Sequence, residues 1–146
     1  ARAVAETTNG VTIADATAPD LPLVYVNAAF ERLTGYPAAQ VVGRNCRFLQ
    51  GGETDPETVA AMGAALREGG YAQATLRNYR ADGRAWWNEI QLSPVHDISG
   101  GLTHYIGFQN DVTNRGEAER EATRLAVAAR ADGWVWLIPW SFGRLA

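Results

Sequence analysis

The residues best suited to chemistry in this sequence lie together at positions 43–50, which read Gly-Arg-Asn-Cys-Arg-Phe-Leu-Gln. The octet contains Cys46, the single cysteine of the chain, with one arginine two residues before it and another directly after it. It also contains two side-chain amides, Asn45 and Gln50. A thiol among so many hydrogen-bond donors is expected to face a bound polar or anionic molecule. We therefore take the octet as the candidate reactive site.

Two interpretations of Cys46 follow from the residues alone. A single cysteine can be a small buried apolar residue, or Arg44 and Arg47 can lower its pKa and make a nucleophilic thiolate. A cysteine–histidine catalytic pair is not predicted, because His96 and His104 both fall in the last expected hairpin. Neither histidine has a metal-ligand spacing to Cys46, so no metal site is predicted.

Three short helices are expected around the octet, over residues 27–35, 37–43 and 55–70. Asn27 is a typical N-cap, and a glycine is a typical end for a helix. Pro56 directly after an aspartate is typical of a helix start. These signals predict helices on both sides of Cys46 in the chain.

Five strands are expected, over residues 11–14, 23–26, 71–80, 85–95 and 102–112. Turn residues at 82–83 and 99–101 predict hairpins between the last three. Two strands, then helices, then three antiparallel strands predict an α+β fold, with a five-stranded antiparallel sheet and short helices on one face.

The chain is expected to divide into a core at residues 11–113 and three flanking parts. Residues 1–10 form an N-terminal flank, and residues 134–146 form a tail rich in tryptophan that either contacts a partner or has no function. Residues 114–133 alternate acidic and basic side chains among alanines, which predicts a C-terminal flanking helix with a thin apolar side. Such a helix needs a partner surface, so a homodimer through the flanking helices is expected.

Composition narrows the classes of partner. The chain has 146 residues and a net charge of -3, and its basic residues are scattered, so neither nucleic acid nor a membrane surface is expected as a partner. A single cysteine cannot form an internal disulfide, which fits a reducing cytoplasm. The absence of a start methionine fits a piece of a longer protein.

The octet resembles the flavin-adduct motif of light-oxygen-voltage (LOV) domains, the blue-light-sensing branch of the PAS family. Three further motifs resemble the other flavin contacts of that family, in the same order and spacing: Asn78-Tyr79-Arg80, Trp87-Asn88 and Gly107-Phe108-Gln109. The similarity extends over roughly residues 11–112, the whole expected core. It implies the PAS fold and a flavin chromophore.

By this resemblance, Arg47 would pair with the phosphate of flavin mononucleotide (FMN), and Asn45 and Gln50 would hydrogen-bond its ribityl chain. Asn78 and Asn88 would bind the pyrimidine edge of the flavin ring. Amide side chains suit that edge, because it alternates hydrogen-bond donors and acceptors, which a carboxylate cannot match.

The remaining implied contacts lie around the ring. Gln109 would lie near N5 and O4 and act as the signal transducer, because its amide can rotate when N5 changes from acceptor to donor. The apolar walls would come from Leu49, Val59, Ile90, Leu92 and Tyr105, together with Phe48.

The turn between the third and fourth strands decides whether the two asparagines can meet one ring. A two-residue turn at Asp82-Gly83 would set Asn78 opposite Trp87, which leaves the amides on opposite faces. We predict a three-residue turn through Arg84, which sets Asn78 opposite Asn88.

One position departs from the family pattern. The family often has a second phosphate-binding arginine on the helix after residue 56, and the matching position here is Gly63. Arg67, one turn later, is a candidate substitute. FMN is therefore the expected cofactor, with riboflavin or FAD as alternatives.

The resemblance implies a blue-light photoreceptor rather than an enzyme. Cys46, a neutral thiol in the dark, would attack flavin C4a under light and form a reversible adduct, and the sheet would carry the signal to flanking helices or a dimer interface. Two other classes of protein are also consistent with these residues. One is a flavin-binding PAS sensor of redox state or ligand without photochemistry, and the other is an interaction module with an empty pocket.

Overall fold

A single antiparallel sheet forms the centre of the protein, whose computed structural model describes residues 9–115 and 125–128. The strands are β1 (Gly10–Asp15), β2 (Leu23–Val26), β3 (Tyr71–Tyr79), β4 (Ala85–His96), β5 (Leu102–Asp111) and β6 (Leu125–Ala128). Their order across the sheet is β2-β1-β5-β4-β3-β6, and each neighbouring pair is antiparallel. The predicted α+β fold with a five-stranded antiparallel sheet is confirmed, and β6 adds a sixth strand at one edge.

The sixth strand corrects part of the prediction for the C-terminal flank. Residues 116–124 and 129–133 of the expected helix lie outside the described residues, as does the tail at 134–146. Leu125–Ala128, however, form β6, which pairs with β3 between Tyr71 and Ala74. The helix prediction is wrong over these four residues. The edge of β3 offers unpaired backbone groups to an extended segment, and a helix with a thin apolar side has little to compete with that pairing.

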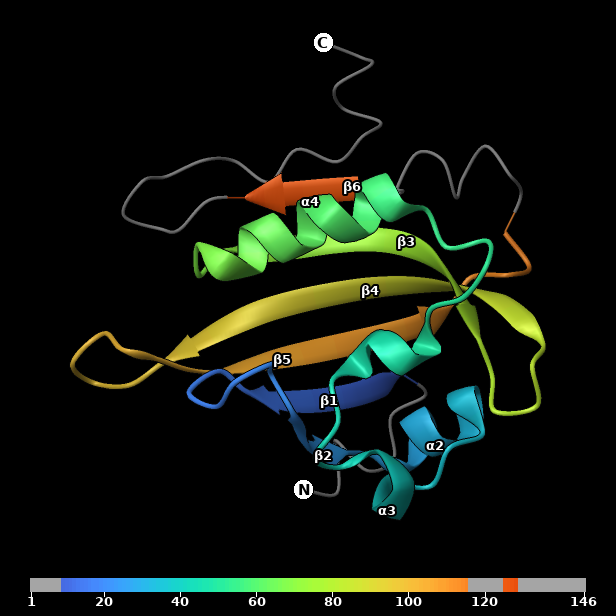
Figure 1. Ribbon diagram of the computed structural model, residues 1–146, viewed down its shortest axis with the longest axis horizontal. Helices are drawn as coiled ribbons and strands as arrows, with labels where there is room; N and C mark the ends of the chain where they lie inside the picture. The colour runs from blue at the N-terminus through green and yellow to red at the C-terminus, as the bar shows by residue number, and fades with distance from the viewer. Residues whose placement is uncertain (1–8, 116–124, 129–146) are drawn as a thin grey trace, which may run out of the picture.

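Short helices precede β3 and cover the sheet. They are α2 (Ala28–Thr34), α3 (Ala38–Val41), the 3-10 turn η1 (Cys46–Leu49) and α4 (Pro56–Arg67). In Figure 1, α4 lies along β3 and η1 lies in front of the sheet, while α2 and α3 lie near β2. The three predicted α-helices are confirmed. The 3-10 turn was not predicted, because a single turn has no periodicity to detect.

Asn27 joins the first helix to the sheet. Its Oδ1 accepts the N–H of Phe30 at 3.0 Å, which caps α2, and the N–H of Val11 at 2.8 Å, which belongs to β1. The helix ends at Gly35, whose φ of 77° is in the left-handed region that glycine favours. One buried amide thus fixes both the start of α2 and its position on β1.

Two apolar clusters fill the space between helices and sheet. The first contains Leu23, Val26, Phe30, Val41 and Leu49, and Cys46 and Phe48 pack against it. The second contains Met62, Ala65, Ala72, Ala74 and Leu76, and Val59, Ile90 and Leu92 pack against it. The octet therefore packs on the β2 side of the core, and α4 packs on the β3 side.

The β3–β4 hairpin has the predicted odd-length turn but a different register. Arg80 donates its N–H to the carbonyl of Arg84 at 2.9 Å, which leaves a three-residue loop at 81–83. Asn78 therefore lies opposite Trp86, and Asn88 opposite Leu76. The prediction that Asn78 and Asn88 are directly opposite is wrong by two residues. Because the shift is even, both amides keep the same face of the sheet.

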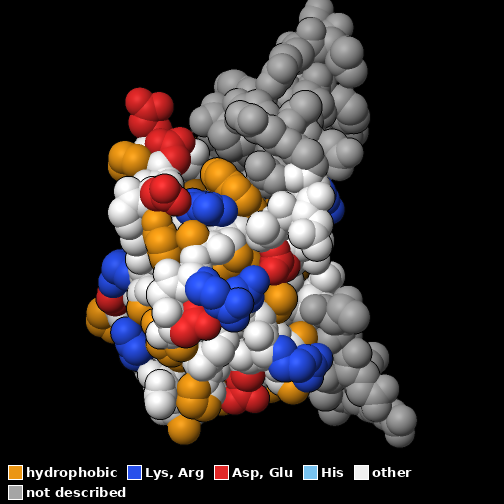
Figure 2. Space-filling model, turned by 90° about the vertical axis from the view of Figure 1, so that its right-hand side faces the viewer, with side chains coloured by type: hydrophobic (Ala, Val, Ile, Leu, Met, Phe, Trp, Pro, Cys, Tyr) orange, Lys and Arg blue, Asp and Glu red, His pale blue; other side chains and the backbone are white. Residues whose placement is uncertain are grey.

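The surface carries mixed charges. Figure 2 shows basic and acidic side chains interspersed with apolar ones over the described part of that face. The pairs Arg77–Glu53, Arg80–Asp111 and Arg84–Asp82 lie 2.7 to 3.2 Å apart. Within residues 9–115 and 125–128, no helix is both long and apolar enough to cross a membrane.

Replacing Asn27 by alanine should lower the free energy of unfolding by about 1–3 kcal/mol, because the buried N–H groups of Phe30 and Val11 lose their acceptor. Urea denaturation of both proteins measures this difference. Asn114→Ala, at an exposed position, is the control and should change stability by less than about 0.5 kcal/mol. Equal stability of the two variants would show that the cap is not a structural requirement.

Candidate functional site

Cys46 is the first residue of η1. The side chain is half-buried and packs against the first apolar cluster. Burial raises the pKa of the thiol to about 12, so Cys46 is protonated throughout the neutral range. Between the two interpretations of this cysteine, the structure favours a neutral thiol over a thiolate.

The two arginines of the octet have other partners than the thiol. The guanidinium of Arg44 lies over the ring of Phe48, 4.5 Å from its centroid. Arg47 makes two hydrogen bonds to the carboxylate of Asp20, at 2.9 and 2.5 Å. This explains why neither arginine lowers the pKa of Cys46. Arg47 is exposed at the rim of the site and can reach an anion there.

The amides of the octet lie at the same rim. Asn45 accepts the N–H of Arg47 at 2.9 Å, which caps η1, and donates its Nδ2 to the carbonyl of Asp20 at 2.7 Å. Gln50 follows η1 and is exposed. The residues predicted to contact the polar chain of a flavin therefore lie together where the site meets solvent.

Three further amides are buried in the sheet, on the face that the helices cover. Asn78 on β3, Asn88 on β4 and Gln109 on β5 are exposed by only 1%, 0% and 2%. Asn88 donates its Nδ2 to Oδ1 of Asn78 at 2.9 Å and accepts the N–H of Asn110 at 3.2 Å. The structure thus brings together the three amides that the sequence singled out, from three adjacent strands.

Gln109 differs from the asparagines, because half of its amide has no partner. Its Nε2 is 3.4 Å from Oγ1 of Thr12, which is a long hydrogen bond, and its Oε1 is buried with no hydrogen-bond partner among the described residues. An unpaired buried acceptor typically costs about 1–3 kcal/mol. Such an orphan is expected at a site that a polar ligand completes.

Two glycines lie next to this amide. A Cβ at Gly107 would lie 2.5 Å from Oγ1 of Thr12 and 3.1 Å from both Nε2 of Gln109 and Cδ2 of Leu92. A Cβ at Gly10 would lie 3.1 Å from Oε1 of Gln109. Neither position has room for a side chain, so glycine at both positions lets β1 and β5 pack closely around the amide. Thr12 and Gly10 were missed in the sequence, where only the inward alternation of the first strand could have indicated them.

The predicted apolar wall residues lie on both sides of the amides. Leu49 belongs to the first cluster, while Val59, Ile90 and Leu92 pack on the second. The hydroxyl of Tyr105 donates to the carbonyl of Leu66 at 2.8 Å and so ties β5 to α4. Across the sheet, Ile90 faces small Ala74, and Leu92 faces Ala72 and Gly107. The two branched side chains therefore lie beside small neighbours in the sheet.

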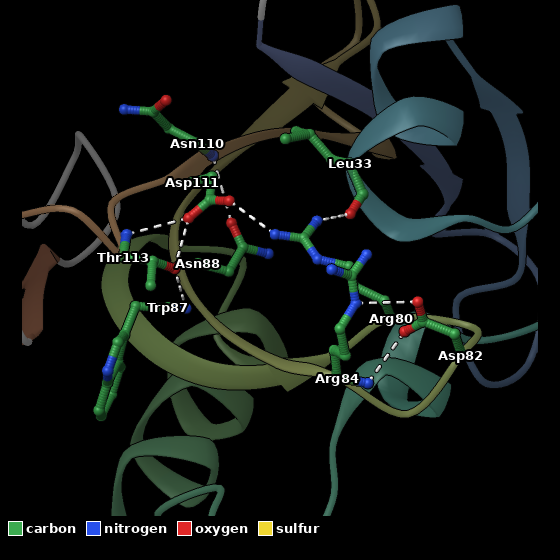
Figure 3. Close-up of polar contacts among 9 residues, drawn as sticks. All are labelled: Leu33, Arg80, Asp82, Arg84, Trp87, Asn88, Asn110, Asp111 and Thr113. Carbon is green, nitrogen blue, oxygen red and sulfur yellow. Dashed lines mark hydrogen bonds and ion pairs between the residues drawn. The ribbon is translucent and has the colours of Figure 1, made fainter.

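Arg80, the last residue of the Asn78-Tyr79-Arg80 motif, connects the site to the end of β5. Its guanidinium donates to the carbonyl of Leu33 in α2 and to Asp111 at 2.7 Å, and Figure 3 shows it between the two. It also lies over the ring of the buried Trp86, 4.9 Å from the centroid. Asp111 in turn accepts the N–H and hydroxyl of Thr113 at 2.9 and 2.6 Å. The amide pair, the hairpin and the exit of β5 are therefore adjacent.

The arrangement fits a flavin. A planar ring with alternating donors and acceptors needs buried amides on one face and apolar walls, and the residues above provide both. A neutral thiol on the covering turn and a guanidinium at the rim match a reactive ring with an anionic chain. No acid–base pair converges on these residues within the described part of the chain.

Comparison with known proteins agrees with this geometry. The family profile described as PAS domain matches residues 8–114. Over 120 residues the chain is 46% identical to the bacterioopsin transcriptional activator of Halobacterium salinarum, covering 82% of this chain and 18% of that protein. Over 115 residues it is 44% identical to blue-light-activated histidine kinase 2 of Erythrobacter litoralis, covering 79% and 33%. The chain thus spans about a fifth to a third of these relatives.

Solved structures of similar proteins give the same result. An RNA-binding light-oxygen-voltage receptor superposes with a TM-score of 0.77 and 53% identity, covering 82% of this chain and 34% of that one. The LOV domain of the Erythrobacter litoralis EL346 blue-light activated histidine kinase superposes with a TM-score of 0.69 and 45% identity, covering 71% of this chain and 95% of that domain. This chain belongs to the PAS family and is a light-oxygen-voltage domain, a blue-light photoreceptor module with a flavin chromophore.

Proposed function

We propose that Cys46 and the three buried amides form the chromophore site of this photoreceptor, and that the chromophore is FMN bound noncovalently in the dark. The observation that carries the proposal is the unpartnered Oε1 of Gln109, buried beside Gly107 and Gly10. Asn78 and Asn88 already fix each other and can bind one edge of the ring. The walls around the ring come from Leu49, Val59, Ile90, Leu92 and Tyr105.

FMN, rather than riboflavin or FAD, is supported by the cations at the rim. Arg47 can reach the terminal phosphate, with Asn45 and Gln50 along the ribityl chain. Arg67 supplies a second cation: its Nη1 lies 3.3 Å from where a Cβ of Gly63 would be, so its side chain folds back over that glycine. Its guanidinium therefore lies next to Gly63, the helix position at which the sequence lacks an arginine. Paired guanidinium–phosphate contacts are strong and favour a phosphorylated ligand.

The chemistry depends on a protonated thiol. When bound, the flavin supplies absorption of blue light and an excited ring that can bond reversibly to a cysteine sulfur. Cys46 can contribute both that sulfur and a proton, because burial keeps its pKa at about 12. The first apolar cluster packs against Cys46 and shields part of it from water.

Gln109 is the proposed transducer. An amide can exchange donor for acceptor by rotating half a turn, and the weak bond to Thr12 presents only a small barrier to this. Gln109 is paired with Gly10 in β1 and Ile90 in β4, two residues before Asp111. Its rotation would therefore act on the strand that ends beside Arg80 and leads out of the core.

The response to light depends on the protein segments that flank the domain. The relatives are longer proteins whose names include a histidine kinase and an RNA-binding receptor, and those activities belong to them. For this chain we propose a sensor that acts through its flanking segments or a homodimer contact in the cytoplasm. A flavin-binding redox sensor without photochemistry is the competing proposal.

The absorption spectrum of the purified protein in darkness and under blue light tests the proposal. We expect a visible flavin band that bleaches in light and recovers in darkness. Cys46→Ala and Cys46→Ser should keep the band but lose the bleaching completely, because the serine hydroxyl has similar size without the thiol's reactivity. A band that is constant under light in the parent would support the redox sensor instead. A colourless protein that takes up no added FMN would refute the site.

The protonation state of Cys46 gives a pH-dependent prediction. The folded thiol titrates near 12 and the unfolded thiol at about 8.5, so above the lower value only the unfolded state releases this proton. The contribution of Cys46 to stability should therefore be constant below about pH 8 and fall by up to ~1.4 kcal/mol per pH unit above it. The difference in urea stability between parent and Cys46→Ser, measured from pH 7 to about 10, checks this. A difference that does not change with pH would show that the thiol is accessible to water.

Gln109→Leu should leave the light-induced bleaching intact but reduce the structural response severalfold, because leucine cannot exchange donor for acceptor. Light-dependent hydrogen exchange and light scattering measure that response. Gln91→Leu, the same change on the opposite face of β4, is the matched control and should respond like the parent. A Gln109→Leu response equal to that of the control would exclude the transducer role.

A further inference from the structure

The ion pair between Arg47 and Asp20 concerns the same guanidinium that the proposed function assigns to phosphate. Nη1 and Nη2 of Arg47 lie 2.9 and 2.5 Å from the two carboxylate oxygens of Asp20. A guanidinium binds a phosphate in the same bidentate way, through two parallel hydrogen bonds. Asp20 therefore occupies the donors that an anionic ligand would use.

The loop that carries Asp20 holds it in this position. Within residues 9–115 and 125–128, Asp20 and Leu21 are the two non-glycine residues with positive φ, at 69° and 49°. The carbonyl of Asp20 accepts Nδ2 of Asn45, and the loop closes where Asp15 donates its N–H to the carbonyl of Pro22 at 2.9 Å. Strained backbone persists where the surrounding contacts impose it, often beside a binding site.

The charges at this point balance before any ligand arrives. Asp20 and Arg47 each keep more than half of their side chain exposed, at 61% and 58%. The guanidinium lowers the pKa of the Asp20 carboxyl, which is therefore ionised at neutral pH. An exposed ion pair is weak enough to open for a doubly charged phosphate. While Asp20 stays near, however, Arg47 offers that phosphate little net attraction.

From these contacts we propose that Asp20 is a specificity-determining residue that competes with the terminal phosphate of the flavin for Arg47. The inference rests on the proposed flavin function. Asp20 reduces the preference for FMN over riboflavin, which lacks the phosphate, without affecting how the ring is held. FMN is therefore preferred over riboflavin by less than Arg47 alone would give, and the preference is set outside the ring pocket.

Dissociation constants of FMN and riboflavin for the flavin-free full chain, measured by quenching of flavin fluorescence, test this. Asp20→Asn keeps the shape and suits a positive φ, but removes the charge. It should raise the ratio of FMN affinity to riboflavin affinity about 3- to 10-fold, within the range of one exposed charge pair. Riboflavin affinity should not change, which also reports that the variant is folded. Asp20→Gly, which tolerates positive φ best, should give the same increase.

Two controls isolate the contact from the change in net charge. Asp82→Asn removes a carboxylate from another exposed pair, with Arg84 at 2.9 Å, and should leave the ratio as in the parent. In an Arg47→Gln background, Asp20→Asn should have no effect, because the shared guanidinium is absent.

The outcomes separate the inference from the function on which it rests. If both flavins bind but the ratio is unchanged or lower in Asp20→Asn and Asp20→Gly, Asp20 does not compete and the inference is overturned while the flavin site stands. An equal increase in Asp82→Asn would overturn it as well, since general charge would explain the effect. If neither flavin binds to the parent, the proposed function fails and the role of Asp20 with it.

Discussion

Hydrogen bonding of amides inside a sheet is the constraint on which the rest of this structure depends. Asn78, Asn88 and Gln109 are buried on three adjacent strands, where water cannot serve as their partner. The two asparagines satisfy each other in part, and the backbone of β5 contributes to Asn88. Gln109 keeps an acceptor without a partner. A core of this kind is stable only if the remaining capacity is small or a ligand uses it.

The packing around the amides follows from this requirement. Gly10 and Gly107 lie next to Gln109. The small residues Ala72 and Ala74 lie opposite Leu92 and Ile90. A Cβ at either glycine would lie too close to its neighbours, so the close packing around Gln109 requires glycine at both positions. The thiol of Cys46 is positioned by a separate element, η1, which rests on the other apolar cluster.

Local signals in the sequence were enough to predict much of this. Asn27 and Gly35 define α2 by capping chemistry that involves only neighbouring residues, and the octet indicated Cys46 and Arg47. Features that depend on distant contacts were not predictable in the same way. The exact partner of Asn78 depends on how three loop residues close, and β6 depends on an open sheet edge. The inward-facing Thr12 has no chemical signal of its own until β1 meets β5.

The position of Arg80 also has a consequence for local unfolding. This one side chain joins α2, the β3–β4 hairpin and the end of β5, and it covers the ring of Trp86. None of these segments can separate from the others without leaving a guanidinium or a carboxylate partly buried and unpaired. They are therefore expected to open and close as one cooperative unit, although they are far apart in the chain. A strand that leaves the core from such a unit moves together with it.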